Sequence, residues 1–169
     1  MSAEPPGYRP PPIDGPHPEQ RRGVQWKAVL YGLAADWAGT FVSSFFISFM
    51  ATMVAAMRFQ SEDQMRTYLE QLFTAPDFLF LTSMVGLLCV ALGGYVAGVR
   101  AKRDPVRHAL MVGFVSLGLS LSMEVVNAGG EPGVYPLWLR WVGNLLVVPF
   151  AYLGGRAAAV RPLDEDEEN

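Results

Sequence analysis

Four long apolar stretches alternate with shorter polar segments along the chain. They occupy about residues 26–57, 78–101, 108–127 and 137–160, and charged side chains are rare within them. Each reaches the ~20 residues that a helix needs to cross the roughly 30 Å hydrocarbon core of a bilayer. The pattern predicts an all-α integral membrane protein whose four transmembrane helices form two hairpins.

A bundle of buried helices in a soluble protein is the alternative interpretation. Such a bundle needs a polar face on each helix, turned toward water. The runs FVSSFFISFMATMVAAM and FLFLTSMVGLLCVALGG lack such a face. The membrane interpretation is therefore preferred.

A shorter helix is predicted between the first two spans. Ser61-Glu62-Asp63-Gln64 has the pattern of a capping box, and it is followed at helical spacing by apolar Met65, Tyr68, Leu69, Leu72 and Phe73. Pro76 is expected to end this helix. We predict a short amphipathic helix in the first outer loop, packed over the mouth of the bundle, because its polar side is mildly acidic rather than basic.

Positive charge is concentrated on one side of the predicted membrane. The loop between the second and third spans holds Arg100, Lys102, Arg103 and Arg107. Ten of the thirteen Lys and Arg residues lie in this loop or in the N- and C-terminal segments. Because Lys and Arg in short loops stay on the cytoplasmic side, both termini are expected in the cytoplasm.

The two ends of the chain have compositions that do not favour a packed core. Seven of the thirteen prolines lie within the first 22 residues, and residues 164–168 are five consecutive acids. Residues 1–25 are therefore predicted to be a disordered Pro-rich cytoplasmic tail and residues 161–169 an acidic cytoplasmic tail. Docking of the first tail to a partner, or of the second to a basic partner, stays open as an alternative. Residues 26–160 are predicted to form the transmembrane domain.

Composition excludes several kinds of chemistry. The chain of 169 residues is 51% hydrophobic and 17% charged, and Cys89 is its only cysteine, so intrachain disulfides and two-cysteine redox chemistry are excluded. The two histidines are His17 in the predicted tail and His108 at the mouth of the third span, and there is no H-E-x-x-H motif. We therefore expect no catalytic residue, no metal site and no cofactor. Nucleic-acid binding is not expected either, because membrane orientation explains the basic loop.

Four polar residues inside the spans are the candidate functional residues: Asp36, Glu124, Arg140 and Asn144. Charged side chains are costly in the bilayer unless they are paired, protonated or hydrated. Asp36 is expected to point into the protein, either as a proton or cation site or as a hydrogen-bonding residue. Glu124 and Arg140 lie at similar depth on antiparallel spans, and we predict that they form an ion pair.

Small residues recur on one side of most spans. Such residues allow close helix approach where lipid offers no hydrophobic drive for association. The predicted helix-packing positions are Gly32, Gly39, Gly86, Gly93, Gly94, Gly154 and Gly155. Residues 92–100 also align without a gap with residues 153–161. This match indicates either an internal repeat of a helical hairpin or a shared packing requirement.

Three motifs together resemble those of small uncharacterised four-pass bacterial membrane proteins. They are Gly32-x-x-x-Asp36-x-x-Gly39-Thr40, Gly93-Gly94-x-x-Ala97-Gly98, and the segment from Pro149 to Gly155. The resemblance covers the membrane portion and not the tails. It implies a four-helix protein of the bacterial inner membrane with both ends in the cytoplasm, and it supplies no catalytic residues.

Two functions fit these observations. The first is a structural or accessory subunit, not an enzyme, which sits in the lipid bilayer and packs against itself or a larger membrane complex. The alternative is a small oligomeric transporter or channel that uses Asp36, Glu124, Arg140 and Asn144 along a polar path. Sealed side-chain pairs would favour the first function, and a hydrated path between the two faces would favour the second.

Overall fold

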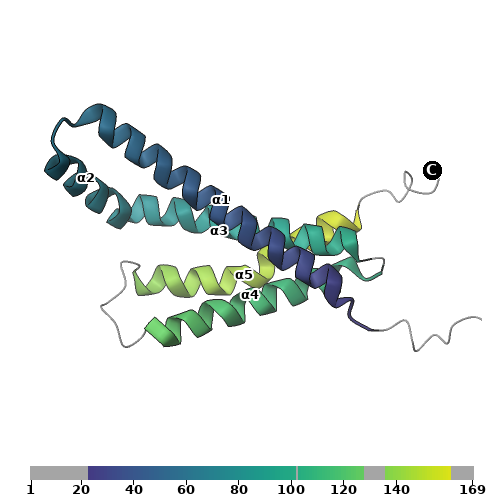
Figure 1. Ribbon diagram of the computed structural model, residues 1–169. Helices are drawn as coiled ribbons and strands as arrows, with labels where there is room; N and C mark the ends of the chain where they lie inside the picture. Colours follow the sequence, from purple (N-terminus) through teal and green to yellow (C-terminus); the bar gives the residue numbers. More distant parts are fainter. Residues whose placement is uncertain (1–22, 102, 128–135, 161–169) are drawn as a thin grey trace, which may run out of the picture.

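The computed structural model describes residues 23–101, 103–127 and 136–160, and these residues form helices and no strand (Figure 1). The helices are α1 (Trp26–Arg58), α2 (Glu62–Thr74), α3 (Pro76–Arg100), α4 (Pro105–Asn127) and α5 (Leu137–Ala159). The predicted acidic tail and all but residues 23–25 of the predicted Pro-rich tail lie outside the described residues.

Helices α1, α3, α4 and α5 are long and apolar enough to cross a membrane. The large side chains that α1 exposes are mostly apolar and include Phe41, Phe45, Phe49 and Met57. Water would disfavour such a surface, whereas lipid tails surround it at no cost. The predicted all-helical class and its four apolar helices are confirmed, and both indicate a membrane protein.

Local sequence explains where several helices begin. Pro76 and Pro105 occupy the first positions of α3 and α4, where a missing N–H is tolerated and the fixed φ suits the helix. Asp104, just before α4, has a φ of 52°, a left-handed conformation that Asp tolerates better than most residues. Helix α2 begins after Ser61, but the Ser61 side chain makes no capping hydrogen bond. The acids Glu62 and Asp63 in its first turn instead favour the helix start electrostatically.

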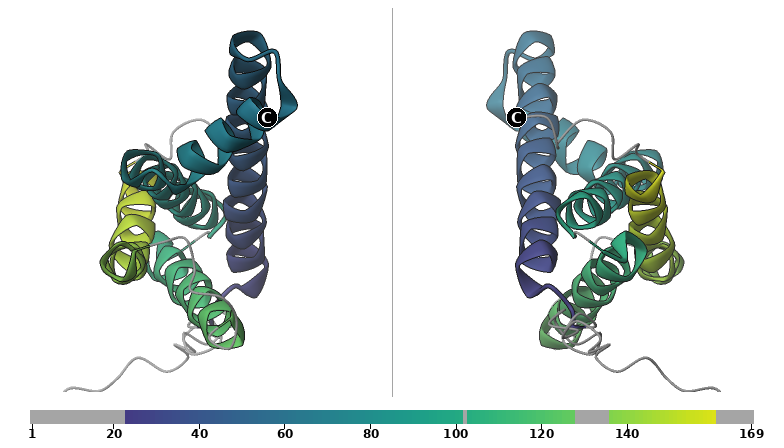
Figure 2. Two further views of the ribbon diagram at one scale, coloured as in Figure 1. Left: turned by 90° about the vertical axis from the view of Figure 1, so that its left-hand side faces the viewer. Right: turned by 90° about the vertical axis from the view of Figure 1, so that its right-hand side faces the viewer.

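Helix α3 lies at the centre of the bundle. It packs most extensively against α5, then against α1 and α4, whereas α1 and α5 do not touch within the described chain. Figure 2 shows this order, with α3 between α1 and α5. Consecutive spans do lie side by side, α1 with α3 and α4 with α5. Because the α3–α5 contact joins these pairs into one unit, their description as two hairpins stays a prediction.

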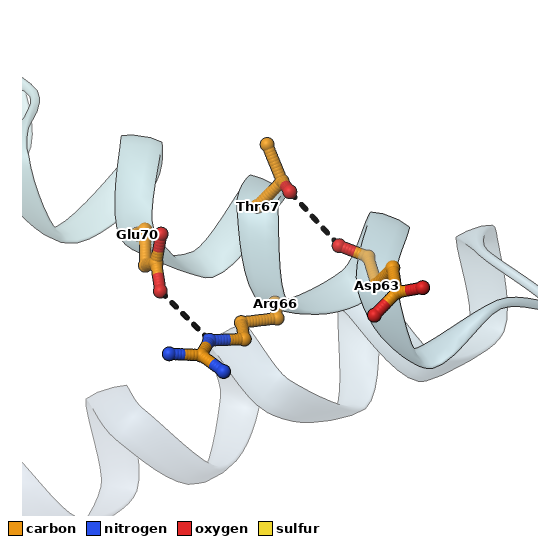
Figure 3. A network of polar contacts seen from close by, with 4 residues as sticks. All are labelled: Asp63, Arg66, Thr67 and Glu70. Atoms are coloured by element: carbon orange, nitrogen blue, oxygen red, sulfur yellow. Dashed lines mark hydrogen bonds and ion pairs between the residues drawn. The ribbon is translucent and has the colours of Figure 1, made fainter.

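The bundle has two distinct ends. At one end, here called the junction end, α1 begins, α5 ends and α3 connects to α4; the opposite end carries α2 (Figure 1). Two ring contacts hold α2 in place, Phe59 with Tyr68 at 5.2 Å between centroids and Phe73 with Phe78 at 5.3 Å. Helix α2 also carries an exposed ion pair, with Arg66 Nε 2.9 Å from Glu70 Oε1 (Figure 3).

Candidate functional site

Helices α4 and α5 join four polar side chains into one chain of contacts, here called the α4–α5 cluster: Ser120, Glu124, Arg140 and Asn144. The Ser120 hydroxyl donates to Asn144 Oδ1 at 2.8 Å, and Asn144 Nδ2 donates to Glu124 Oε1 at 3.1 Å. Arg140 Nε lies 3.4 Å from the same Glu124 oxygen. The predicted ion pair between Glu124 and Arg140 is therefore present.

Helical spacing creates this cluster. Ser120 and Glu124 are four residues apart on α4, and Arg140 and Asn144 are four residues apart on α5, so each pair shares one helix face. Asn144 is buried between the helices, and its amide supplies both a donor and an acceptor. The side chains of Glu124 and Arg140 remain 29% and 33% exposed. The neutral amide thus links an ion pair at the surface of the bundle to the serine of α4.

Asp36 belongs to a second, separate contact near the middle of the bundle. Its side chain is only 5% exposed, and the Ser116 hydroxyl of α4 donates to Asp36 Oδ2 at 2.8 Å. A Cβ atom placed on Gly93 of α3 would lie 2.9 Å from Asp36 Cβ. Asp36 therefore points into the protein as expected, between α3 and α4. Its partner Ser116 was not predicted, because residues 80 positions apart meet only through helix packing.

Five of the seven predicted packing glycines mark places where two helix backbones nearly touch. A Cβ on Gly32 would lie 2.7 Å from the Gly93 carbonyl oxygen, and one on Gly93 would lie 2.7 Å from the Gly32 carbonyl oxygen. Added Cβ atoms at the other three positions would strike the backbone of Ala151 from Gly94, the backbone of Ala91 from Gly154, and Ala109 Cβ from Gly155. Side chains at these positions would force the helices apart.

The other two glycines behave differently. A Cβ on Gly39 would lie 3.2 Å from Cys89 Sγ, a tight contact with a side chain rather than with backbone. Gly86 departs from the expectation, since a Cβ there would meet nothing within 4 Å. Its spacing from Gly93 is right for a shared helix face, but Gly86 lines an open space instead of a helix contact. Helices α1 and α3 diverge toward the α2 end (Figure 1).

The glycine contacts do not follow the alignment of residues 92–100 with 153–161. That alignment matches Gly93 with Gly154, yet Gly93 touches α1 whereas Gly154 touches α3. Gly155, the next residue, is the one that touches α4, the span preceding its own. The contact with the preceding span is therefore made by Gly155 and not by Gly154, the residue that the alignment matches with Gly93.

A buried histidine ties the starts of α1 and α4 together at the junction end. His108 is 3% exposed, and its Nε2 accepts a hydrogen bond from the Gln25 backbone N–H at 2.9 Å. Since Nε2 is the acceptor, the neutral ring carries its proton on Nδ1, which lies 3.0 Å from the Asp104 carbonyl oxygen. The sequence placed His108 at the mouth of the third span, but it pointed neither to the burial of this side chain nor to Gln25 as its partner.

Arg100, one of the basic residues that set the predicted orientation, also has a structural contact. Its guanidinium lies 4.6 Å from the centre of the Tyr31 ring on α1, the geometry of a cation–π contact. This contact adds to those between α1 and α3 at the junction end.

In these contacts the polar side chains of the bundle act as hydrogen-bond donors and acceptors and as an ion pair. Within the described ranges, no three His, Cys, Asp or Glu side chains gather closely enough to hold a metal ion. Every buried side-chain nitrogen and oxygen in that part of the chain has a hydrogen-bond partner. Comparisons of the chain with protein-family models, curated proteins and solved structures found no match.

Proposed function

We propose that this protein is a structural or accessory subunit that packs in the membrane against a second copy or a larger complex, with no catalytic activity of its own. This role is supported by the contacts among the polar side chains of the spans, which bind one another. Asp36 is bound by Ser116, and Asn144 is bound by both Ser120 and Glu124. Such bonds satisfy polar groups in the bilayer and hold helices together.

The lining of a nearby cavity also supports a packing role. A cavity of about 300 Å³ lies beside the α4–α5 cluster and is lined by residues of α3, α4 and α5, among them Ser83 and Glu124. Asp36 is not part of its lining. A transport path would need to include both Asp36 and the α4–α5 cluster, and of these two only the cluster lines this cavity.

The proposed setting is the inner membrane of a bacterium, in keeping with the resemblance to small four-pass proteins. The junction end would face the cytoplasm because it carries Arg100, Arg103 and Arg107, and positive residues in short loops stay on that side. Both chain termini would then be cytoplasmic. The exposed apolar side chains of α1 offer surface both for lipid and for a partner helix.

A small oligomeric transporter or channel is the alternative, and one observation favours it. Glu124 and Arg140 are each about a third exposed and line the cavity beside the cluster. An oligomer could bring several such cavities around one axis. In that case Asp36, Glu124, Arg140 and Asn144 would carry the moving ion or proton.

Two measurements on the full chain separate these functions. Purification in mild detergent should yield a species larger than the monomer, either an oligomer or a complex with a defined partner. The purified protein in liposomes should pass protons and monovalent cations no faster than protein-free liposomes. A monomer without partner would contradict the accessory role, and a flux abolished by Glu124→Gln would establish the transport alternative.

A further inference from the structure

A cavity of about 690 Å³ lies among α1, α2 and α3 at the α2 end of the bundle. Met65, Leu69 and Phe73 of α2 form one apolar wall. The facing parts of α1 and α3 include Ser44 and Gly86. This volume is within the range of pockets that hold small molecules or cofactors. We call it the α2 cavity.

The packing of the bundle keeps this cavity open. Helices α1 and α3 touch at Gly32 and Gly93 and again where Gly39 meets Cys89, and beyond that point they diverge. The Phe73–Phe78 ring contact holds α2 beside the start of α3. Gly86 contributes no side chain to fill the space, and a Cβ there would find no atom within 4 Å.

The α1 wall presents hydroxyl groups at regular intervals. Thr40, Ser44 and Ser48 line the cavity and are spaced four residues apart, so they form one stripe of the helix. None of these three hydroxyls donates a hydrogen bond to another residue of the described chain, unlike Ser43, which bonds the Gly39 carbonyl. They are therefore available to an occupant that carries hydrogen-bond acceptors on an otherwise apolar body.

The rim of the cavity carries one positive and one negative charge. Arg66 and Glu70 both line it, and both side chains are largely exposed. Their mutual contact uses only Arg66 Nε and Glu70 Oε1, and in Figure 3 the two terminal nitrogens of Arg66 carry no dashed contact. The terminal N–H groups match a phosphate, because guanidinium binds phosphate oxygens in pairs. The second Glu70 oxygen can accept from an ammonium group.

We propose that the α2 cavity binds one phospholipid whose headgroup carries both a phosphate and a primary amine, namely phosphatidylethanolamine. The phosphate pairs with Arg66 and the ammonium with Glu70. The glycerol ester oxygens accept hydrogen bonds from the hydroxyl stripe of α1, and an acyl chain lies along Met65, Leu69 and Phe73. The surrounding bilayer supplies the lipid. This binding is independent of the proposed accessory role.

Headgroup selectivity provides the first test. The full-length protein, purified in detergent, is titrated with phosphatidylethanolamine, phosphatidylcholine or phosphatidylglycerol of identical acyl chains and observed by native mass spectrometry. We expect one tightly bound phosphatidylethanolamine, with affinity about tenfold above the other two lipids, since one charge-assisted hydrogen bond changes affinity by about that factor.

Glu70→Gln should reduce the affinity for phosphatidylethanolamine to that for phosphatidylcholine, and Arg66→Gln should weaken the binding of all three lipids. Glu62→Gln, also on α2 but outside the cavity lining, should change none of them. Equal binding of the three lipids by the unaltered protein would overturn the proposal.

Filling the cavity provides the second test. Gly86→Leu should place its side chain in the α2 cavity and lower phosphatidylethanolamine binding at least tenfold without destabilising the helices. Gly118→Leu on α4 is the matched control, because a Cβ there also meets nothing within 4 Å and Gly118 is not in the cavity lining. Unchanged binding by Gly86→Leu would place the lipid elsewhere and overturn the proposal. If Gly86→Leu does not fold, the exposed Glu70→Gln variant decides the question alone.

Discussion

Glu124 shares one carboxylate oxygen between two partners on α5, Asn144 and Arg140. The Asn144 contact is the shorter, at 3.1 Å against 3.4 Å for Arg140 Nε. Asn144 therefore does more than fill space beside the ion pair, since its amide also bonds Ser120. The sequence placed Glu124, Arg140 and Asn144 on facing stripes, but which atoms meet depends on how far each helix is rotated about its axis.

The first prediction concerns the energy of this ion pair. Glu124→Gln and Arg140→Gln should each lower the free energy of unfolding by roughly 1–2 kcal/mol, because each leaves a charge without its partner at a partly exposed position. The double variant should lose less than the sum of the two, since no unpaired charge remains. Thermal unfolding in detergent and folded yield in membranes provide the measurement. Additive losses would show that the two charges do not interact energetically.

The second prediction concerns the hydrogen bond to Asp36. Ser116→Ala removes the hydroxyl donor and leaves the buried carboxyl without that bond, so stability should fall by roughly 1–3 kcal/mol. Ser116→Thr retains a hydroxyl and serves as the control. Thermal unfolding of both variants in one detergent is the comparison. An alanine variant as stable as the unaltered protein would mean that water or another group replaces Ser116.

Close helix contact in this fold depends on individual glycines. Gly93 and Gly94 are neighbours in α3, yet Gly93 meets α1 and Gly94 meets α5. Two adjacent residues therefore let α3 approach helices on two of its sides. A stripe of small residues predicts close helix contacts, but it does not identify the helix that makes each contact. Gly86 belongs to such a stripe, and yet a Cβ there would meet no atom within 4 Å.

The third prediction separates these glycines by experiment. Gly93→Leu and Gly154→Leu should each destabilise the protein by roughly 1–3 kcal/mol or prevent folding, because their side chains would strike the backbone of α1 and α3. Gly118→Leu should leave the midpoint of thermal unfolding nearly unchanged. Equal midpoints for all three variants would mean that the α1–α3 and α3–α5 contacts are loose.

The fourth prediction concerns the connection between the starts of α1 and α4. His108→Phe keeps a ring in the buried site but removes the acceptor for the Gln25 N–H, so stability should fall by roughly 1–2 kcal/mol. His108→Gln keeps a side-chain acceptor and should lose less. Hydrogen exchange at residues 25–29 is the direct measurement, with faster exchange expected in the phenylalanine variant. Unaltered exchange there would show that Gln25 does not depend on His108.

For the molecule as a whole, orientation follows from the charges at the junction end, and it is the fifth prediction. In a Cys89→Ser background, a single cysteine at Ser61 should react with a membrane-impermeant reagent added to intact cells. A single cysteine at Arg103 should react only after the membrane is opened. Both residues are exposed in the structure. Reaction at residue 103 in intact cells would reverse the proposed topology.

The sequence by itself determined the helices. Apolar length and the position of proline act within one segment, so the four long apolar helices could be predicted along with bounds close to those observed. The inward position of Asp36 followed from the cost of a charge in lipid, and the Glu124–Arg140 pair from similar depth on neighbouring spans. These properties depend on the composition of one segment and on how far a residue lies from the end of its span. Both can be read from the sequence.

Only the tertiary structure decided which surfaces meet. The central place of α3, the Ser116–Asp36 bond, the His108–Gln25 bond and the open space beside Gly86 all depend on the rotation and divergence of helices about one another. Those angles result from many weak packing contacts between residues distant in sequence, and no single segment encodes them. The α2 cavity has the same origin, because it exists where α1 and α3 separate and α2 bridges them.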